Sequence, residues 1–295
     1  MDKTYPCGEG TVNWVDTAWL ESHLGDKNLA IIDVQPDVHD YFKRHIPGAV
    51  YMHEGLLRAP AGTDPAHYLP TDAIRIIFRQ VGIRADVPTV VYTGTGAFKG
   101  WGDGLEQTMA AYTLQRFGHR NVLVLDGGVD RWVAERRTLS KDFPDVRPSD
   151  FEPRVNADCF IEYDEFREIK DRDDVAILDV RPANFYEGQG PWKKPGHIPG
   201  ALNLPWQSLM DKTNKRLFKP DQEIRDIVGQ LGLDRDKLAI SSCGTGREAT
   251  SVYLILKHYL GFPKVKIYEG SFTEWVAKDN PTVTGKTPRE AAARV

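Results

Sequence analysis

Short apolar runs and longer amphipathic stretches alternate along the whole chain. The apolar runs are typical of strands buried on both faces of a sheet, and the clearest are residues 30–34, 176–180 and 238–240. Helices are predicted where apolar side chains recur every three or four positions, in residues 17–24, 73–81, 163–169, 224–231 and 248–260. Strands that alternate with helices indicate an α/β fold, with a largely parallel sheet covered on both faces.

The chain also repeats itself once. Five segments of the first half recur in the same order in the second half. They pair residues 30–36 with 176–182, 45–49 with 197–201, 81–83 with 231–233, 91–96 with 241–246, and 121–132 with 264–275. A repeat of this length is a duplicated domain and not a solenoid.

The duplication and the length of 295 residues together predict two domains. The stretch 140–154 holds three prolines and seven charged residues without a clean period, which is typical of an extended connector. We therefore expect an N-terminal domain in residues 1–139, a linker in 140–156 and a C-terminal domain in 157–295.

Composition narrows the functional classes. With 41% hydrophobic and 27% charged residues and a net charge of −4, the chain resembles an ordinary globular protein with no bulk attraction to nucleic acid. No window is apolar enough for a membrane span, and the first residues show no signal segment. We expect a cytoplasmic protein, although a mature exported protein would look the same.

The three cysteines are too scattered for a disulfide framework, and none shares metal-ligand spacing with a histidine. This usage favours a reducing compartment, no bound metal and one reactive thiol. Cys7 and Cys159 are expected to be incidental.

Cys243 stands where the pattern changes from strand to helix, and Gly244 and Gly246 follow it. A helix N-terminus carries unpaired N–H groups and about half a positive charge, which lowers the pKa of a thiol. The glycines allow successive N–H groups to converge on an anion, and Arg247 adds a full charge. We expect a reactive thiolate; the alternative is a small buried hydrophobic side chain.

Only the second half has this cysteine. Thr93 takes the corresponding place in the first half, although Gly-Thr-Gly follows in both halves. The first loop then continues through a longer glycine-rich segment, residues 97–106. We predict an active C-terminal domain and an inactive N-terminal domain that shapes the cleft between them.

These motifs resemble those of the two-domain rhodaneses, the thiosulfate and 3-mercaptopyruvate sulfurtransferases, over nearly the whole chain. The resemblance rests on Asp-Val-Arg-Pro at 179–182, the two His-Ile-Pro-Gly-Ala loops, Cys-Gly-Thr-Gly at 243–246 and Gly-Ser-Phe-x-x-Trp at 270–275. It implies two similar domains, each with a five-stranded parallel sheet and helices on both faces. It also implies that Cys243 is catalytic, in a six-residue loop of the second domain.

Dual-specificity phosphatases share this fold, but they need an arginine six residues after the cysteine. Ala249 stands at that place, and Arg247 lies only four residues after Cys243. The shorter loop suits a sulfur atom carried on the cysteine. Phosphatase activity is therefore not expected.

The resemblance implies a sulfurtransferase that needs no metal or organic cofactor. The Cys243 thiolate takes the sulfane sulfur of a small-molecule donor, for which we expect thiosulfate, and forms a persulfide. A thiophilic acceptor such as cyanide or a thiol then removes that sulfur. The alternatives are 3-mercaptopyruvate as the donor, or a persulfide carrier that delivers sulfur to a partner protein. We expect a monomer without nucleic-acid or membrane partners.

The residues that follow the nucleophile are predicted to bind the substrate, and they are Gly244, Thr245, Gly246, Arg247 and Glu248. The Gly-Thr-Gly part is close to the mercaptopyruvate pattern of the family, whereas Arg247 and Glu248 fit neither pattern. The Thr245 hydroxyl could donate to the departing group. Arg247 could attract dianionic thiosulfate, or Glu248 could neutralise Arg247.

Asp179 and Arg181 end the first strand of the active half and are further candidates for substrate binding. The alternative is a structural pair that braces the end of the sheet. Asp33 takes the place of Asp179 in the inactive half, which favours the structural role for that carboxylate. Gln35 takes the place of Arg181, so the arginine charge belongs to the active half alone.

Two histidines and one aromatic residue complete the first set of candidates. His45 and His197 occur in both repeats, which argues for loop bracing over proton transfer. Phe185 stands about where the family often has a substrate-binding arginine, so that role is absent or moved.

An insertion in the active half holds Trp192, Lys193 and Lys194. These residues could line the rim of the cleft, but a solvated loop is the expectation. From the first half, Arg58 and Trp101 could reach across to the active site.

Overall fold

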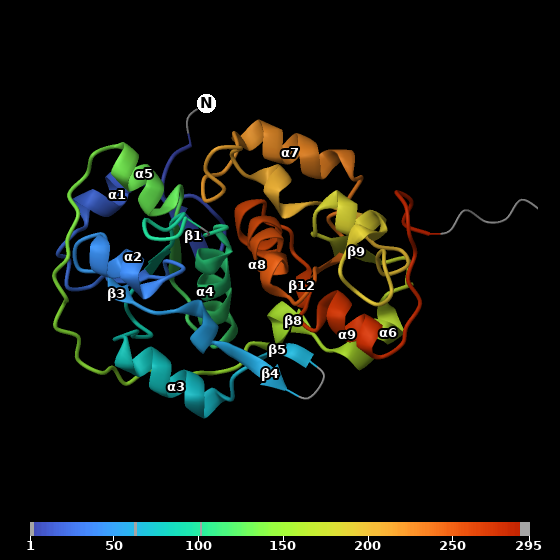
Figure 1. Cartoon of the computed structure of the whole chain (residues 1–295), viewed down its shortest axis with the longest axis horizontal. Helices are drawn as coiled ribbons and strands as arrows, with labels where there is room; N and C mark the ends of the chain where they lie inside the picture. The colour runs from blue at the N-terminus through green and yellow to red at the C-terminus, as the bar shows by residue number, and fades with distance from the viewer. Residues whose placement is uncertain (1–2, 62–63, 101, 290–295) are drawn as a thin grey trace, which may run out of the picture.

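The computed structural model describes residues 3–61, 64–100 and 102–289 and shows two α/β lobes side by side (Figure 1). The sheet of the first lobe has the strand order β1-β7-β6-β2-β3, and all neighbouring strands are parallel. Its strands are β1 (Val12–Val15), β2 (Ala30–Asp33), β3 (Val50–Tyr51), β6 (Thr89–Tyr92) and β7 (Val122–Leu125). Its helices are α1 (Thr17–Ser22), α2 (Val38–Lys43), the short 3-10 turn η1 (Glu54–Leu56), α3 (Thr71–Gln80), α4 (Leu105–Arg116) and α5 (Gly128–Ala134).

The second lobe repeats this plan. Its strand order is β10-β9-β11-β12-β8, and again all neighbours are parallel. The strands are β8 (Phe160–Ile161), β9 (Val175–Asp179), β10 (Leu202–Asn203), β11 (Leu238–Ser242) and β12 (Val265–Tyr268). The α-helices are α6 (Tyr163–Ile169), α7 (Asp221–Gln230), α8 (Arg247–Leu254) and α9 (Ser271–Ala277), and the shorter turns are η2 (Ala157–Cys159), η3 (Phe185–Gln189), η4 (Trp206–Leu209) and η5 (Ile255–Tyr259).

The two strand orders are the same when each is followed from its β3 or β10 edge, so the duplication in the sequence is a duplication of the fold. The predicted α/β class with two parallel five-stranded sheets is confirmed. The central strands are β6 and β11, and each is buried because helices cover both faces of its sheet. The carboxyl end of β11 leads directly to Cys243.

Amphipathic spacing explains the outer helices. In α3, Ile74 and Phe78 are four residues apart and fully buried, while Asp72 and Arg79 lie at opposite ends, where their charges suit the helix dipole. The predicted helix 248–260 starts one residue earlier, as α8, and its last part is the π-helical turn η5.

The two lobes meet through α4 and α8, which pack against each other (Figure 1). Every residue of α4 is buried, because one face lies on its own sheet and the other on the second lobe. The contact includes a hydrogen bond between the Thr108 and Thr250 hydroxyls at 3.1 Å and a T-shaped pair of Tyr112 and Tyr253 with centroids 5.3 Å apart. The helix that follows the Thr93 loop is thus an interface element.

Two further segments bridge the lobes. Residues 141–156 form neither helix nor strand and run along the first lobe, where Phe151 is buried and Arg154 N–H donates to Phe117 O at 2.9 Å. The antiparallel hairpin of β4 (Arg58–Ala61) and β5 (Asp64–Tyr68) extends from the first lobe toward α9 of the second (Figure 1). The alanine-rich end, residues 290–295, lies outside the described residues.

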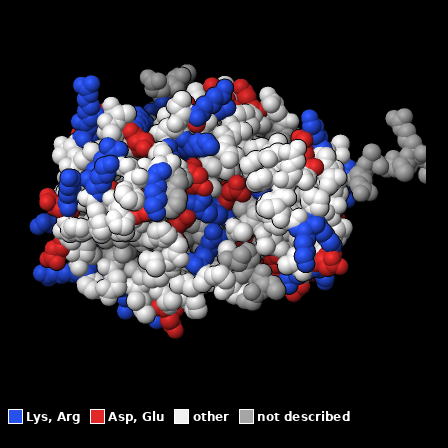
Figure 2. All heavy atoms as spheres, viewed as in Figure 1, with Lys and Arg blue, Asp and Glu red and all other residues white. Residues whose placement is uncertain are grey.

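Acidic and basic side chains are interspersed over the face drawn in Figure 2. No helix in the described part of the chain is long and apolar enough to cross a membrane.

Candidate active site

Cys243 lies at the carboxyl end of β11, immediately before the loop that leads into α8. Its side chain is buried, with 1% of the residue exposed. The backbone of Cys243 is held at both ends: its N–H donates to the Ser271 hydroxyl at 3.1 Å, and its carbonyl accepts the Phe272 N–H at 3.0 Å. The start of α9 therefore fixes the position of the nucleophile.

Close neighbours restrict both glycines of the loop, and Gly246 the more strictly. Gly246 has φ +78°, and a Cβ there would stand 2.6 Å from the carbonyl oxygen of Glu269. A Cβ on Gly244 would stand 3.0 Å from the Trp192 ring. The indole N–H of Trp192 donates to the Thr273 hydroxyl at 2.9 Å, so the ring lies against the loop. The expectation that this tryptophan belongs to a solvated loop is wrong.

Burial, more than the helix N-terminus, determines the acidity of the thiol. It raises the pKa of Cys243 to about 11, and the Glu248 carboxylate acts in the same direction. The backbone N–H groups of Ala249 and Thr245 and the Arg58 guanidinium lower that pKa, but by less. The predicted net lowering of the pKa is therefore wrong for the free protein, because desolvation of a fully buried thiolate outweighs the N–H groups around it.

A cavity of about 260 Å³ opens beside the loop. It is lined by Gly244, Thr245, Arg247 and Glu248 of the loop, by Asp103 and Leu105 of the first lobe, and by Trp206, Gln207 and Lys215 of the second. We call it the active-site cavity. Four of the five predicted loop residues line this cavity, and Gly246 does not.

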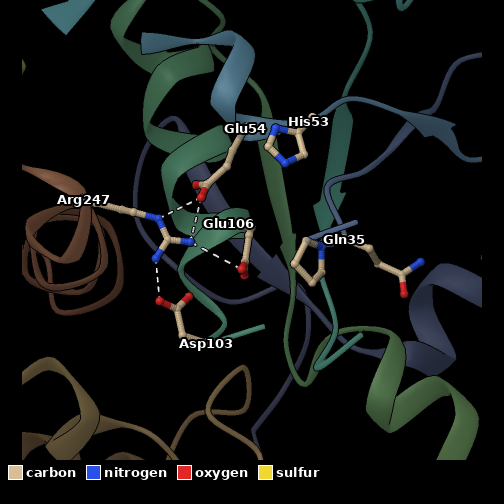
Figure 3. Close-up of a pocket in the computed structure, with 7 residues that line it drawn as sticks. Gln35, His53, Glu54, Asp103, Glu106 and Arg247 are labelled. Carbon is tan, nitrogen blue, oxygen red and sulfur yellow. Dashed lines mark hydrogen bonds and ion pairs between the residues drawn. The ribbon is translucent and has the colours of Figure 1, made fainter. Parts of the chain in front are cut away.

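Arg247 points away from its own lobe. Its Nε and Nη2 contact Glu54 Oε1 at 2.8 and 2.7 Å, its Nη1 contacts Asp103 Oδ2 at 2.5 Å, and its Nη2 lies 3.3 Å from Glu106 Oε1 (Figure 3). All three carboxylates come from the first lobe. The sequence does not reveal them, because nothing in their local patterns indicates a partner in the other half.

Glu248 is half-buried and lines the active-site cavity together with Arg247. Burial and the Asp179 and Asp103 carboxylates together raise its pKa to about 7, and the Arg181 guanidinium opposes them. A carboxyl group with such a pKa exchanges its proton near neutral pH, which ordinary glutamates do not.

Asp179 and Arg181 form a buried ion pair behind the loop. Arg181 Nε lies 2.9 Å from Asp179 Oδ1, Arg181 Nη2 donates to Gly196 O at 2.8 Å, and the guanidinium carbon stands 4.0 Å from the centre of the Phe272 ring. Arg181 is 0% exposed, and neither member of the pair lines the active-site cavity. This burial favours a structural role, in which the pair braces the end of the sheet, over a role in substrate binding.

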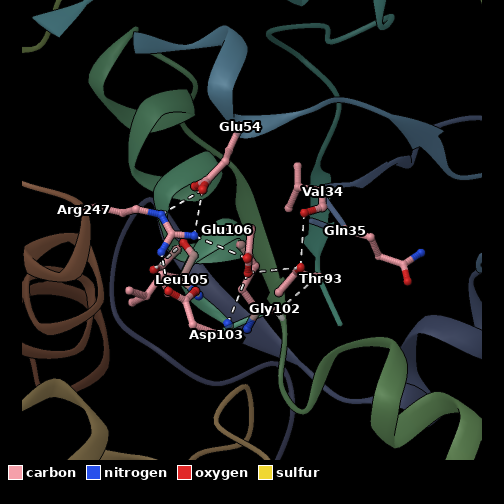
Figure 4. Close-up of polar contacts among 12 residues, drawn as sticks. Val34, Gln35, Glu54, Thr93, Gly102, Asp103, Leu105, Glu106 and Arg247 are labelled. Carbon is pink, nitrogen blue, oxygen red and sulfur yellow. Dashed lines mark hydrogen bonds and ion pairs between the residues drawn. The ribbon is translucent and has the colours of Figure 1, made fainter. Parts of the chain in front are cut away.

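The first lobe shows what the same position looks like without the nucleophile. Gln35 Nε2 donates to Asp33 Oδ2 at 2.8 Å, in the manner of Arg181. The Thr93 hydroxyl donates to Val34 O at 3.1 Å and to Glu106 Oε2 at 3.3 Å (Figure 4). A carboxylate of the lobe itself therefore occupies the place where an anion would sit.

A second cavity, of about 230 Å³, lies beside this inactive loop (Figure 3). We call it the acidic cavity. Its lining consists of Gln35, Pro36, His53, Glu54, Asp103, Glu106 and Arg247. It shares Asp103 and Arg247 with the active-site cavity.

Arg58 reaches across to the active loop, as the sequence suggested. Its Nη1 donates to the carbonyl of Thr245 at 2.6 Å from the start of β4. Trp101, the other residue considered for this role, lies outside the described residues.

The remaining candidates lie around the site without entering it. The ring nitrogens of His197 contact the carbonyls of Tyr186 and Thr287 at 2.9 and 3.1 Å, which is the predicted bracing geometry. Phe185 packs edge-on against Trp192 with centroids 5.9 Å apart. Among residues 3–61, 64–100 and 102–289, no three His, Cys, Asp or Glu side chains gather as a metal site requires.

Ser271 is a contact of Cys243 that comparison of the two repeats could have revealed. The repeat pairs it with Gly128, so the hydroxyl at this position belongs to the second half alone. Both residues have positive φ, +53° for Ser271 and +58° for Gly128. A serine in this strained region deserves a functional explanation, and its bond to Cys243 supplies one.

Comparison with known proteins agrees with this geometry. The family model described as "Rhodanese-like domain" matches residues 16–135 and 162–278. A putative thiosulfate sulfurtransferase of Synechococcus elongatus is 32% identical over 94% of this chain and 87% of its own length. The sulfur carrier protein TtuD of Thermus thermophilus is 30% identical over 88% of this chain and 92% of its own.

A 3-mercaptopyruvate sulfurtransferase of Escherichia coli is 29% identical over 91% of this chain and 96% of its own. The crystal structure of SseA from E. coli, described as a 3-mercaptopyruvate sulfotransferase with the rhodanese fold, superposes with a TM-score of 0.77 at 27% identity and covers 88% of this chain and 98% of that one. The chain therefore belongs to the rhodanese family and is a sulfurtransferase with two rhodanese-like domains.

Proposed function

We propose that this sulfurtransferase moves the sulfane sulfur of thiosulfate to a thiophilic acceptor through a persulfide on Cys243. The observation that carries the proposal is the position of Cys243 at the base of a cavity-lining loop, with the N–H groups of Thr245 and Ala249 directed at its sulfur. The first domain has Thr93 at this position and is taken to be catalytically inactive.

The first step needs the thiolate, so the proton of Cys243 has to leave. Glu248 is the proposed acceptor, because its charge acts on the thiol and its pKa of about 7 leaves about half of it ionised, and so able to take a proton, in neutral solution. Protonation of Glu248 also removes the negative charge that opposes the thiolate. The proton transfer from Cys243 to Glu248 therefore makes the Cys243 thiolate less unfavourable.

The thiolate then attacks the outer sulfur of thiosulfate. A new S–S bond forms to Cys243, the S–S bond of thiosulfate breaks, and its electron pair leaves with sulfite. The persulfide anion remains among the loop N–H groups, which stabilise it as they would stabilise the thiolate. Cyanide or a thiolate acceptor then attacks the terminal sulfur, and the electron pair of the breaking bond returns to Cys243.

Lys215 supports thiosulfate as the donor. It is exposed and lines the active-site cavity together with Gly244 and Thr245. A cation at the mouth of a small cavity raises the local concentration of a dianion. The relative from S. elongatus named as a putative thiosulfate sulfurtransferase points in the same direction.

A second candidate donor is 3-mercaptopyruvate. Its carbon leaving group is an enolate that needs a proton, and Glu248 in its protonated form can supply one, whereas sulfite needs none. The Gly244–Gly246 pattern and the E. coli relative also favour this donor. A role as a persulfide carrier, as the name of TtuD describes, would use the same Cys243 chemistry.

Mass spectrometry of the intact protein tests the common step. Treatment with thiosulfate is expected to add about 32 Da, one sulfur atom, to the wild type and nothing to Cys243→Ser. Parallel kinetics with both donors and cyanide then rank thiosulfate against 3-mercaptopyruvate. The absence of an adduct with either donor would reject the proposed function, and slow turnover to cyanide with rapid transfer to a protein thiol would favour the carrier role.

A further inference from the structure

One wall separates the active-site cavity from the acidic cavity. Arg247 and Asp103 line both cavities, and Glu54 and Glu106 line the acidic cavity next to them. We call Glu54, Asp103 and Arg247 the wall cluster. Two of its members come from the inactive domain and one from the catalytic loop (Figure 4).

Carboxylates of the wall cluster contact each nitrogen of the Arg247 guanidinium. Glu54 Oε1 lies 2.8 Å from Nε and 2.7 Å from Nη2, and Asp103 Oδ2 lies 2.5 Å from Nη1. All three nitrogens of Arg247 therefore face carboxylates of the first domain. The side chain of Arg247 is 23% exposed, and those of Glu54 and Asp103 are 19% and 43% exposed.

The charges of the wall cluster do not cancel. Arg247 contributes one positive charge, and Glu54 and Asp103 contribute one negative charge each, so one negative charge remains. Glu106 stands behind the cluster, 3.3 Å from Nη2, and burial raises its pKa to about 7, so it adds part of another negative charge. The net charge of the wall cluster is thus negative although the cluster contains an arginine.

We propose that the wall cluster selects sulfur donors by their charge: Glu54 and Asp103 pair with Arg247 and leave the cluster negative, which weakens the binding of dianionic thiosulfate, opposing Lys215, more than that of monoanionic 3-mercaptopyruvate. This inference rests on the proposed sulfur transfer at Cys243. It assigns Arg247 a role as a positioning and charge-setting residue rather than a donor-binding one. It also gives the inactive domain a part in substrate choice.

The physical consequence depends on the charge of the donor. The interaction of a fixed charge with a ligand is proportional to the ligand's charge, so thiosulfate, a dianion, responds twice as strongly as 3-mercaptopyruvate, a monoanion, on a free-energy scale. Neutralising one carboxylate should lower KM for thiosulfate about fivefold and KM for 3-mercaptopyruvate about twofold, with little change in kcat.

Four variants test whether KM for thiosulfate follows the net charge of the wall cluster. Asp103→Asn keeps the oxygen that accepts the Leu105 N–H at 2.9 Å, and it makes the wall cluster neutral. Arg247→Met removes the cation and should raise KM for thiosulfate. The double variant has the net wall charge of the wild type, and its KM is expected to return to about the wild-type value. The fourth protein, Glu54→Gln, should behave as Asp103→Asn does.

The outcome separates this proposal from direct donor binding by Arg247. If Arg247 bound the donor, the double variant would remain as poor as Arg247→Met, and that result would overturn the proposal. Equal changes of KM for both donors would overturn it too. Glu269→Gln is the matched control, since it breaks another pair across the domain interface, with Arg116 at 2.8 Å, and lines neither cavity. It should leave the ratio of the two KM values unchanged.

A binding experiment distinguishes a failure of this inference from a failure of the proposed function. Sodium thiosulfate and sodium 3-mercaptopyruvate are each titrated calorimetrically into Cys243→Ser and into Cys243→Ser with Asp103→Asn. Binding in that background requires no persulfide. The added Asp103→Asn change is expected to tighten thiosulfate binding about fivefold and 3-mercaptopyruvate binding about twofold, a relative gain of about 2.5-fold for thiosulfate. Unchanged relative affinity would reject the charge selection even if sulfur transfer at Cys243 is established.

Discussion

The Ser271 hydroxyl accepts the backbone N–H of Cys243 at 3.1 Å and donates to Tyr268 O at 2.8 Å. Ser271 has φ +53°, in the left-handed region that costs a residue with a Cβ about 1 kcal/mol. The inactive half has Gly128 at this place, with nearly the same φ and no hydroxyl. Strain in the active domain thus accompanies a hydrogen bond that fixes the nucleophile.

Ser271→Gly should separate stability from activity. The change removes the strain together with the hydroxyl, so the free energy of unfolding is expected to stay within about 1 kcal/mol of the wild type. Persulfide formation on Cys243 should slow about tenfold, because the loss of one hydrogen bond loosens the loop. Urea unfolding and single-turnover mass spectrometry measure the two effects. A wild-type rate of persulfide formation would show that the hydroxyl does not position the cysteine.

Arg58 is expected to tune the thiol from the other domain. Its guanidinium lowers the pKa of Cys243 and donates to the Thr245 carbonyl. Arg58→Met should raise that pKa and slow alkylation by iodoacetamide at neutral pH about threefold to tenfold. Arg58→Lys keeps the charge and should recover part of the loss. Identical pH profiles of alkylation for the wild type and the methionine variant would contradict the assignment.

Glu248 should leave a mark on the pH dependence of sulfur transfer. As a base it works only when ionised, and its pKa is raised to about 7, so the rate of persulfide formation should rise with pH through about 7. In Glu248→Gln that inflection should disappear. Because the Glu248 carboxylate raises the pKa of Cys243, the thiol of the variant should also titrate at lower pH than the wild-type thiol. An inflection near pH 7 that persists in the variant would assign the proton acceptor elsewhere.

Glu106 should make the protein less stable as pH rises. Burial and the Asp103 carboxylate raise its pKa from 4.5 to about 7 in the folded state. Between these values the folded protein keeps a proton that the unfolded chain has lost, so the stabilisation present below pH 4.5 is lost as pH rises through about 7. Glu106→Gln should remove about 1–3 kcal/mol of this pH dependence. Denaturant unfolding at several pH values measures it, and parallel curves for both proteins would contradict the assignment.

Lys215 should matter for thiosulfate in a salt-dependent manner. Lys215→Ala is expected to raise KM for thiosulfate about threefold to tenfold at low ionic strength and less in high salt, since exposed charges are screened. Lys212 is an exposed neighbour that does not line the active-site cavity, so Lys212→Ala is the matched control. Equal changes of KM in Lys215→Ala and Lys212→Ala would show that Lys215 acts only through the overall surface charge and does not bind thiosulfate in the cavity.

Much of the fold and the position of the nucleophile could be predicted from local patterns. The apolar runs locate β2, β9 and β11, and the repeat predicts two sheets of the same strand order. The change from strand to helix places Cys243 at a carboxyl strand end, where α/β proteins bind ligands. The direction of its pKa shift was not predictable, because desolvation depends on everything packed around the sulfur, including Trp192 and Phe272 beside the loop.

The sequence by itself determined the duplication, the order of strands and helices, and which half carries the nucleophile, since these follow from patterns a few residues long and from comparison of the two repeats. Only the tertiary structure decided which residues of the first lobe contact the loop that follows Cys243. Arg247 meets Glu54 and Asp103, and Thr245 meets Arg58, because the packing of α4 on α8 brings the first lobe against the loop that precedes α8. Contacts between residues more than a hundred positions apart carry no local signal, and the charge that a donor meets depends on them.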